Sequence, residues 1–508
     1  MLLPIELPPG VMANGTEYEA KGRWRIADLI RWYEGHMQPI GGWQRFSANP
    51  LAAPARGICA WRDNIGVRRA AFGTASNLYV ADGSAVTDIT PSGLASGMVD
   101  QSAGGGFGAG VYSSGYAYGV PPVGAGLETD ATYWSLDSFG EILLGLSNVD
   151  GRLCYWAPNA TPAQSTAAFV SGAPTNAQAM FVTDERMAVL LGAGGNPREV
   201  AWCNQGDYTN WTASATTTAG DLQLQSNGRV RAGWKIGGGQ NLVLTDADAH
   251  LMAYEGYPYI YGARRIGVGC GIIAPRAFAA VGNLSVWMGK KSFWMYNGAV
   301  NALPCDVADA IFNNLNTQQT SKICMGVNAQ FNEIWVFFPS LSSTENDSYA
   351  FWNFRDNYWG VGLGVLGRTS WVDQEVWDYP LACGADANLY EHENGWTDAG
   401  MPRTNVSAES GPYELTFPLG FNNGDAIANV GQIVSDAYSG GGVVQLGFTG
   451  RFTPNGQKYT FGPYTMRSDG YTDARFCGRQ ITMQVQQTTD GLWHVGNVRV
   501  DATPGSRR

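Results

Sequence analysis

The sequence predicts an all-β protein: a β-propeller with an N-terminal extended arm and a C-terminal β-sandwich-like domain. Composition favours this class, because 67 of 508 residues are Gly, 24 are Pro, 12% are aromatic and only 15% are charged. Globular proteins average roughly 7% Gly, 5% Pro and 25% charged residues. Aromatic side chains suit the half-buried face of a sheet, and Gly and Pro suit the turns between strands. This composition argues against a helical bundle. The 44% of apolar residues argue against disorder.

Residues 1–50 are expected to form an arm with a hairpin. Strand-like residues 28–33 are followed by the turn Glu34-Gly35 and by a second apolar segment, 37–43. Two such segments around a short Gly-containing turn are typical of a hairpin. The arm has little core of its own, so we expect it to pack onto the rest of the chain or onto a neighbouring copy.

Residues 51–404 are expected to form the propeller, because a short aromatic strand followed by a polar turn recurs through them. The aromatic residue of each occurrence is one of Tyr79, Tyr155, Trp202, Tyr254, Tyr296, Trp352 and Tyr390. Four of the six intervals between them lie near the roughly 40–50 residues of a four-stranded blade. Blades stack face to face in a ring, which covers the sheet faces that a single blade leaves exposed. Seven motifs fit six blades plus a shared or closing strand, which is favoured, or seven blades, which are possible.

Two segments of the propeller region depart from this pattern. Residues 104–119 are a Gly/Tyr-rich insertion that we expect at the surface, with Phe107, Tyr112, Tyr116 and Tyr118 as candidate contacts to a partner or to a channel lumen. Near residue 306 a short helix is expected, with Asp306 as its N-cap. Its apolar positions lie on one face and are Val307, Ile311, Phe312 and Leu315.

The sequence pattern of residues 405–508 differs from that of the propeller region and predicts a β-sandwich-like domain. Segments 443–448 and 481–486 alternate apolar and polar residues, and a third alternating segment, 493–500, follows the turn at 489–491. Alternation with period two indicates half-buried strands, and strands with turns at this density are typical of a sandwich.

No pattern of catalytic, cofactor-binding or metal-binding residues stands out in the sequence. The histidines occur singly, and none has a second His or Cys at a metal-ligand spacing: His36, His250, His392 and His494. The eight cysteines are also scattered, so free thiols are expected. Neither a nucleophile elbow nor a P-loop motif is present. We therefore expect no catalytic residue, no cofactor and no metal.

Paired carboxylates are the enzymatic alternative, because propellers also carry glycosidases. Glycoside cleavage needs two carboxyl groups on one cleft. The candidates Asp88, Asp137 and Glu333 cannot be paired from sequence. The segment 206–211 resembles part of the Asp-box turn of sialidase-like propellers, but it occurs once and that turn is structural.

Charge and hydropathy restrict the partners. The net charge is −11, with 32 Lys and Arg against 43 Asp and Glu. Tight binding of phosphates needs clustered cations, so the excess of acidic residues argues against tight binding of nucleic acid. The same excess is compatible with a channel through which DNA slides. The sequence contains no apolar run long enough for a membrane-spanning helix, and its start lacks the features of a secretory signal. We therefore expect a soluble protein made in a cytoplasm.

Several segments, in their order along the chain, resemble the tail nozzle proteins of short-tailed bacteriophages, also called tail hub or packaged-DNA stabilisation proteins. The resemblance covers nearly the whole chain. The segments that carry it are 29–35 with 39–43, the Gly/Tyr-rich insertion, 245–256, 293–298 and 333–340.

The resemblance implies a structural, non-enzymatic virion protein of a podovirus tail. It implies a β-propeller subunit in a hexamer below the portal adaptor ring protein, with docking sites for tail fibre, spike or needle proteins. DNA would pass through the channel during ejection without sequence-specific binding, and assembly would take place in the host cytoplasm. A propeller glycosidase or depolymerase and a receptor-binding adhesin of a virion stay open as alternatives.

Overall fold

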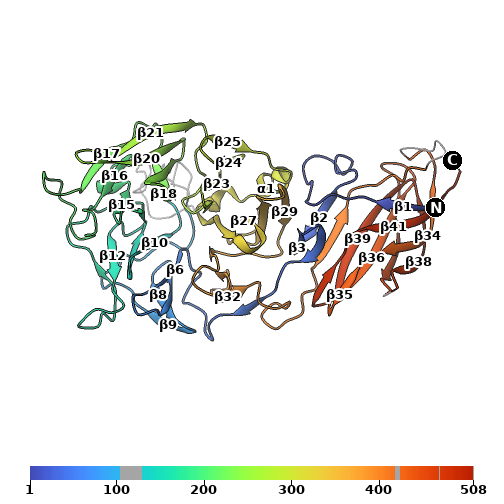
Figure 1. The fold of residues 1–508 in the computed structure, drawn as a ribbon, viewed down its shortest axis with the longest axis horizontal. Coiled ribbons are helices and arrows are strands. Elements are labelled where there is room, and N and C mark those ends of the chain that lie inside the picture. The colour runs from blue at the N-terminus through green and yellow to red at the C-terminus, as the bar shows by residue number, and fades with distance from the viewer. Residues whose placement is uncertain (103–128, 418–423, 468, 507–508) are drawn as a thin grey trace, which may run out of the picture.

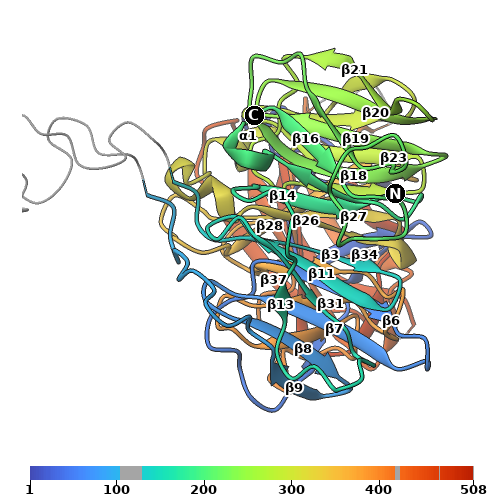
Figure 2. The same cartoon turned by 90° about the vertical axis from the view of Figure 1, so that its left-hand side faces the viewer.

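The computed structural model describes residues 1–102, 129–417, 424–467 and 469–506, and the fold is all-β (Figure 1). The described helical segments are short: α1 (Ala308–Phe312) and the 3-10 turns η1 (Ala193–Gly195), η2 (Thr317–Lys322) and η3 (Ala329–Phe331). Strands fall into a propeller and a sandwich that lie side by side along the longest axis of the molecule. In Figure 2 the propeller faces the viewer and sandwich strands lie behind it.

Seven four-stranded antiparallel sheets form the propeller among the described residues. In chain order the first four blades are β6 (Ile58–Arg62), β7 (Arg68–Gly73), β8 (Leu78–Asp82) and β9 (Ala85–Asp88); β10 (Trp134–Phe139), β11 (Ile142–Ser147), β12 (Leu153–Trp156) and β13 (Ala168–Phe169); β14 (Ala179–Val182), β15 (Ala188–Leu191), β16 (Glu199–Trp202) and β17 (Gly220–Gln223); and β18 (Val230–Gly237), β19 (Gln240–Thr245), β20 (Asp248–Gly256) and β21 (Ile260–Val268). The last three are β22 (Phe278–Val281), β23 (Leu284–Met288), β24 (Phe293–Tyr296) and β25 (Val300–Leu303); β26 (Cys324–Asn328), β27 (Glu333–Phe338), β28 (Ser348–Asn353) and β29 (Tyr358–Gly362); and β30 (Ser370–Val372), β31 (Leu381–Cys383), β32 (Leu389–His392) and β5 (Trp43–Arg45).

The ring is closed by contacts between the first strands of successive blades. β6 contacts both β10 and β30, and the contacts continue through β14, β18, β22 and β26. Between the fourth and fifth blades, Trp234 stacks on Phe278 with ring centroids 3.8 Å apart. The prediction of a β-propeller is confirmed.

The blade count among the described residues is seven, the number that the sequence analysis allowed, and not the six that it favoured. Each of the seven aromatic motifs is the third strand of one blade, namely β8, β12, β16, β20, β24, β28 and β32. The expected count was too low because one of the seven motifs was taken for a shared or closing strand. The last motif, β32, instead belongs to a complete blade, whose fourth strand is β5 from the N-terminal segment.

The sandwich consists of two sheets. One contains β1 (Leu2–Ile5), β41 (Val498–Pro504), β34 (Ala428–Ser435) and β38 (Tyr471–Gly478); the other contains β2 (Trp24–Asp28), β33 (Ser407–Ser410), β39 (Gln480–Thr489), β36 (Val443–Arg451) and β37 (Tyr459–Thr465). Phe448 and Phe476 stack between the sheets with ring centroids 4.2 Å apart. A short pair, β35 (Tyr438–Gly440) and β40 (Leu492–His494), lies beside them.

The first fifty residues serve both parts of the molecule. β1 and β2 are sandwich strands, β5 is a propeller strand, and β3 (Ile30–Tyr33) pairs with β4 (His36–Pro39) as the predicted hairpin. One continuous cluster of buried apolar side chains includes Trp32 of the hairpin, Trp335 of the sixth blade and Val485 of the sandwich. The arm therefore packs onto its own chain and joins the two domains.

The expected helix is present, but its capping differs from the prediction. α1 begins after Val307, which is the N-cap and makes no side-chain capping bond. Asp306 instead pairs with Arg23 at 3.2 Å. Val307, Ile311 and Leu315 are buried as expected.

Candidate functional site

A buried ionic cluster fixes the β3–β4 hairpin to the propeller. Arg31 on β3 donates through Nε and Nη2 to the two carboxylate oxygens of Glu333, at 3.0 and 2.9 Å. It also donates to both oxygens of Glu393, at 2.9 and 2.6 Å. The Arg31 and Glu333 side chains have no exposed surface, and that of Glu393 is 7% exposed. Arg31 thus joins the sixth and seventh blades to the hairpin.

The electrostatics of this cluster follow from burial and charge. Burial raises the pKa of Glu333 to about 7, although Arg31 opposes that shift. Burial alone would lower the pKa of Arg31, but the two carboxylates outweigh it and raise that pKa above its usual value. Trp335 donates its indole N–H to Glu333 at 2.9 Å, which satisfies a further lone pair of the carboxylate. Removing one member of such a buried ion pair leaves the charge of the other member without a counter-charge, which is strongly destabilising.

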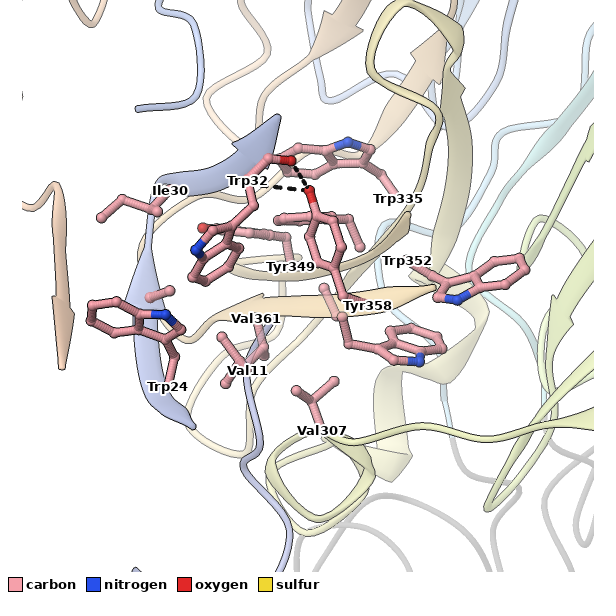
Figure 3. Packing of buried hydrophobic residues seen from close by; sticks show 14 of the residues in the cluster. Val11, Trp24, Ile30, Trp32, Val307, Trp335, Tyr349, Trp352, Tyr358 and Val361 are labelled. Atoms are coloured by element: carbon pink, nitrogen blue, oxygen red, sulfur yellow. Dashed lines mark hydrogen bonds between the residues drawn. The ribbon is translucent and has the colours of Figure 1, made fainter. Parts of the chain in front are cut away.

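Aromatic side chains support the same junction (Figure 3). Tyr358 donates its hydroxyl to the carbonyl of Trp32 and accepts from the Trp32 N–H at 3.2 Å. Their rings meet edge to face, with centroids 5.6 Å apart. The hydroxyl of Tyr349 accepts from the backbone N–H of Leu29 at 2.8 Å. The hairpin backbone is therefore held at several points by side chains of the sixth blade.

A second feature is a stem formed by residues 100–102 and 129–131. Ser102 and Thr129 exchange two backbone hydrogen bonds of 3.0 Å. Gln101 bonds through its backbone and side chain to Gln319 and Ser321. The stem thus holds together the two described ends on either side of residues 103–128.

Ion pairs fasten both sides of this stem to the propeller. Asp130 pairs with Arg231 of β18 at 2.6 Å, and both side chains are less than one-tenth exposed. Asp100 pairs with the buried ammonium of Lys322, which also bonds Glu345 at 2.8 Å. The stem is therefore tied to the propeller by an ion pair on each of its two sides.

A pocket of about 610 Å³ lies beside the stem. Its lining brings together cations, carboxylates and the helix α1: Gln101, Asp130, Arg229, Arg231, Asp246, Lys290, Lys291, Asp309 and Phe312. Its mixed charge and position make the stem and pocket a candidate contact surface.

The four residues predicted as partner contacts lie outside the described residues. They are Phe107, Tyr112, Tyr116 and Tyr118. The stem at 100–102 and 129–131 shows only where the chain enters and leaves that part of the sequence. Sequence reasoning missed Arg31 and Glu393, and it considered Glu333 only as a candidate for glycoside cleavage. A single Arg within the apolar run 29–33 is a signal for a buried, paired charge.

The carboxylates considered for glycoside cleavage lie in different blades. Asp88 on β9 is exposed and bonds Thr90, whereas Asp137 on β10 accepts from the backbone N–H groups of Ser138 and Val182. Glu333 belongs to the Arg31 cluster. The structure therefore does not present them as a set facing one cleft.

Two of the histidines that occur singly in the sequence lie together in the structure. His36 and His494 are not isolated, because their rings stack with centroids 5.5 Å apart. All eight cysteines are free thiols, as predicted. Among the described residues, no three His, Cys, Asp or Glu side chains are grouped to hold a metal ion. No helix in the described parts of the chain is long and apolar enough to cross a bilayer.

No protein-family model and no curated protein matches this chain. Similar solved structures include YCF48 bound to a D1 peptide, with 8% identity, a TM-score of 0.41, and coverage of 72% of this chain and 97% of that one. Raptor of Chaetomium thermophilum has 8% identity and a TM-score of 0.41 over 70% of this chain and 29% of its own. The computationally designed Ika8 protein has 12% identity and a TM-score of 0.36 over 69% of this chain and 99% of its own. At these TM-scores, the likenesses do not bear on function.

Proposed function

We propose that this chain is the structural subunit of a phage tail nozzle. Identical copies form a hexameric ring that closes the distal end of the tail channel, retains packaged DNA and conducts it during ejection. The ring binds the portal adaptor ring protein above and carries tail fibre, spike or needle proteins. The protein is part of the virion tail and assembles in the host cytoplasm.

The observation that supports this proposal most is the rigid union of the propeller with the sandwich. The hairpin β3–β4 is held by a buried Arg between two carboxylates, and a single apolar core continues from blades into sandwich. In a ring of identical subunits, each subunit contacts its two neighbours through two different surfaces. The ring closes only if the angle between these two surfaces is fixed at the right value. A stiff two-domain body meets that need.

Charge supports the same proposal. The net charge of −11 favours repulsion of a polyphosphate rather than its capture. Strong ion pairs to DNA would hold the polymer in place, and each one would have to be broken during passage. An acidic protein wall lets DNA slide without sequence-specific binding.

The test is the state of assembly of the purified chain. We expect negative-stain images and light scattering to show six-membered rings, either for the chain alone or after it is mixed with the adaptor ring of its virion. Monomers under both conditions would contradict the proposal. Monomers that cleave a host polysaccharide would favour the glycosidase, and monomers that bind a glycan without turnover would favour the adhesin.

A second experiment tests the Gly/Tyr-rich insertion as a contact. Replacing Tyr112, Tyr116 and Tyr118 by Ser should leave the melting temperature of the monomer unchanged and impair ring formation or DNA retention. The matched control replaces Tyr257 and Tyr259, which are 74% and 75% exposed at the tip of β20–β21. Deleting 104–119 should likewise leave the monomer folded. A monomer that unfolds on deletion would show that this segment belongs to the core.

A further inference from the structure

The pocket of about 610 Å³ beside the stem combines an apolar part with a charged part. Its wall comes from the stem, from the fourth and fifth blades with the connection between them, and from the segment 308–320 that contains α1 and η2. Ile272 and Leu315 are buried in this wall, and Ile273 and Phe312 are half-buried. The pocket therefore offers an apolar contact surface that polar side chains surround.

The three carboxylates in the lining are already engaged. Asp130 pairs with Arg231 at 2.6 Å, and Asp246 pairs with Arg229 at 3.4 Å. Asp309 accepts a hydrogen bond of 2.9 Å from a backbone N–H of the N-terminal arm. Both arginines of the pocket thus have a counter-charge within the chain.

Two lysines of the same lining have none. Lys290 and Lys291 are exposed and occupy the centre of the turn between β23 and β24. The turn is closed by a hydrogen bond of 2.8 Å from the Gly289 N–H to the Ser292 carbonyl. Neither ammonium group has an ion-pair or hydrogen-bond partner among the described residues.

This pair stands apart from the other lysines of the chain. The remaining four each pair with a carboxylate, and they are Lys21, Lys235, Lys322 and Lys458. The two lysines without a carboxylate are therefore neighbours in sequence and line one pocket. In a chain with a net charge of −11, these adjacent cations form a local site that attracts negative charge from outside.

The composition of the wall indicates which anion fits. Small-molecule sites are mostly apolar with few polar groups, whereas this lining is largely polar. A nucleic acid would bring its phosphates against three carboxylates, and tight binding of phosphates needs clustered cations. A protein segment can place carboxylates on the lysines and an apolar side chain on the apolar part of the wall at the same time.

We propose that this pocket binds a partner protein through an acidic segment. An apolar side chain of the segment packs against Ile273 and Phe312, and flanking Asp or Glu carboxylates pair with Lys290 and Lys291. The pocket lies within one copy of the chain, so the monomer is expected to bind such a segment. Failure of this binding would leave the proposal of a ring untouched, and failure of the ring would leave this binding testable.

The experiment uses the full chain to select from a display library of random peptides. We expect the selected peptides to be enriched in Asp or Glu next to an aliphatic or aromatic residue. Fluorescence anisotropy then measures the Kd of a selected peptide. Lys290→Gln combined with Lys291→Gln should raise this Kd by about three- to tenfold, because exposed ion pairs are individually weak. Added salt should weaken binding to the natural chain more than binding to this double variant.

The matched control combines Lys235→Gln with Lys458→Gln, which removes two lysines elsewhere and should leave the Kd unchanged. Lys290→Glu combined with Lys291→Glu should lose the acidic peptides and select basic ones. The variants at positions 290 and 291 should melt as the natural chain does, since both side chains are exposed and unpaired. The proposal is overturned if acidic peptides are not enriched or if they bind the Gln double variant unchanged. It is equally overturned if a single-stranded DNA oligonucleotide binds these lysines more tightly than the peptides do.

Discussion

Arg31 shows how one side chain determines the relation between distant parts of this chain. Its partners Glu333 and Glu393 are about three hundred or more positions away in sequence, and all three side chains are buried. The cation compensates two carboxylates that could not both stay ionised without it. Removing the cation therefore costs much more than the loss of a surface ion pair.

Arg31→Met is expected to lower the free energy of unfolding by about 3–5 kcal/mol, because it leaves two buried carboxylates facing each other. Urea unfolding followed by tryptophan fluorescence measures the change. Arg355→Met, at an exposed position, is the matched control and should stay within about 0.5 kcal/mol. The double variant Arg31→Met with Glu333→Gln should lose less than the sum of the single variants, and strict additivity would contradict the pairing.

At the scale of elements, blades pack by placing an indole against a glycine of the preceding blade. A Cβ atom added at Gly326 on β26 would lie 2.2 Å from Cδ1 of Trp371 on β30. The same arrangement recurs between the first two blades, where a Cβ at Gly73 would lie 2.2 Å from Cγ of Trp134. Glycine at these positions is required by close approach between neighbouring sheets.

Gly326→Ala should destabilise the protein by about 1–3 kcal/mol, because the added methyl forces the Trp371 indole out of its packed position. Gly431→Ala on β34 is the control, since a Cβ there meets no atom within 4 Å. The control should be neutral or slightly stabilising. Thermal unfolding of both variants measures the difference, and equal melting temperatures would contradict this account of blade packing.

The contact between β4 and β40 should depend on pH. His36 and His494 stack there, and burial together with His36 lowers the pKa of His494. At pH values between the lowered pKa of His494 in the folded state and its pKa near 6.5 in the unfolded state, the unfolded chain binds more protons than the folded chain. Stability from this group is therefore present above pH 6.5 and is lost as the pH falls through the pKa of the folded state.

We expect His494→Phe to keep the ring stacking and to make the free energy of unfolding less dependent on pH below pH 6.5. Unfolding free energies measured from pH 7.5 down to pH 5 for both proteins test the point. If the natural chain and His494→Phe lose stability in parallel below pH 6.5, the stacked pair is not the source of the dependence.

Local pattern predicted the elements well and their long-range pairing poorly. The aromatic motif located the third strand of every blade, since it depends on side chains within one strand. The closing strand β5 carries no such motif, and its pairing with β32 spans most of the chain. The same limit applies to the site: Arg31 is visible as an isolated charge in an apolar run, but its partners follow only from the fold.

At the scale of the whole molecule, the hairpin makes the propeller and the sandwich share one core. β1 and β2 complete the sandwich, β5 completes the ring, and the residues between them carry the ionic cluster. Unfolding either domain would expose apolar surface that the other buries. Parts of a protein that bury apolar surface against each other tend to unfold together as one cooperative unit.

The natural chain is therefore expected to unfold in one calorimetric transition in which sandwich and propeller melt together, although separate domains commonly melt separately. Arg31→Met should split this transition into two, because the hairpin then loses its anchor on the sixth and seventh blades while each sheet keeps its own hydrogen bonds. Scanning calorimetry measures both profiles, with Arg355→Met as the single-transition control. Two transitions in the natural chain would show that the domains are energetically independent, and the rigid body invoked for ring assembly would then lack its physical basis.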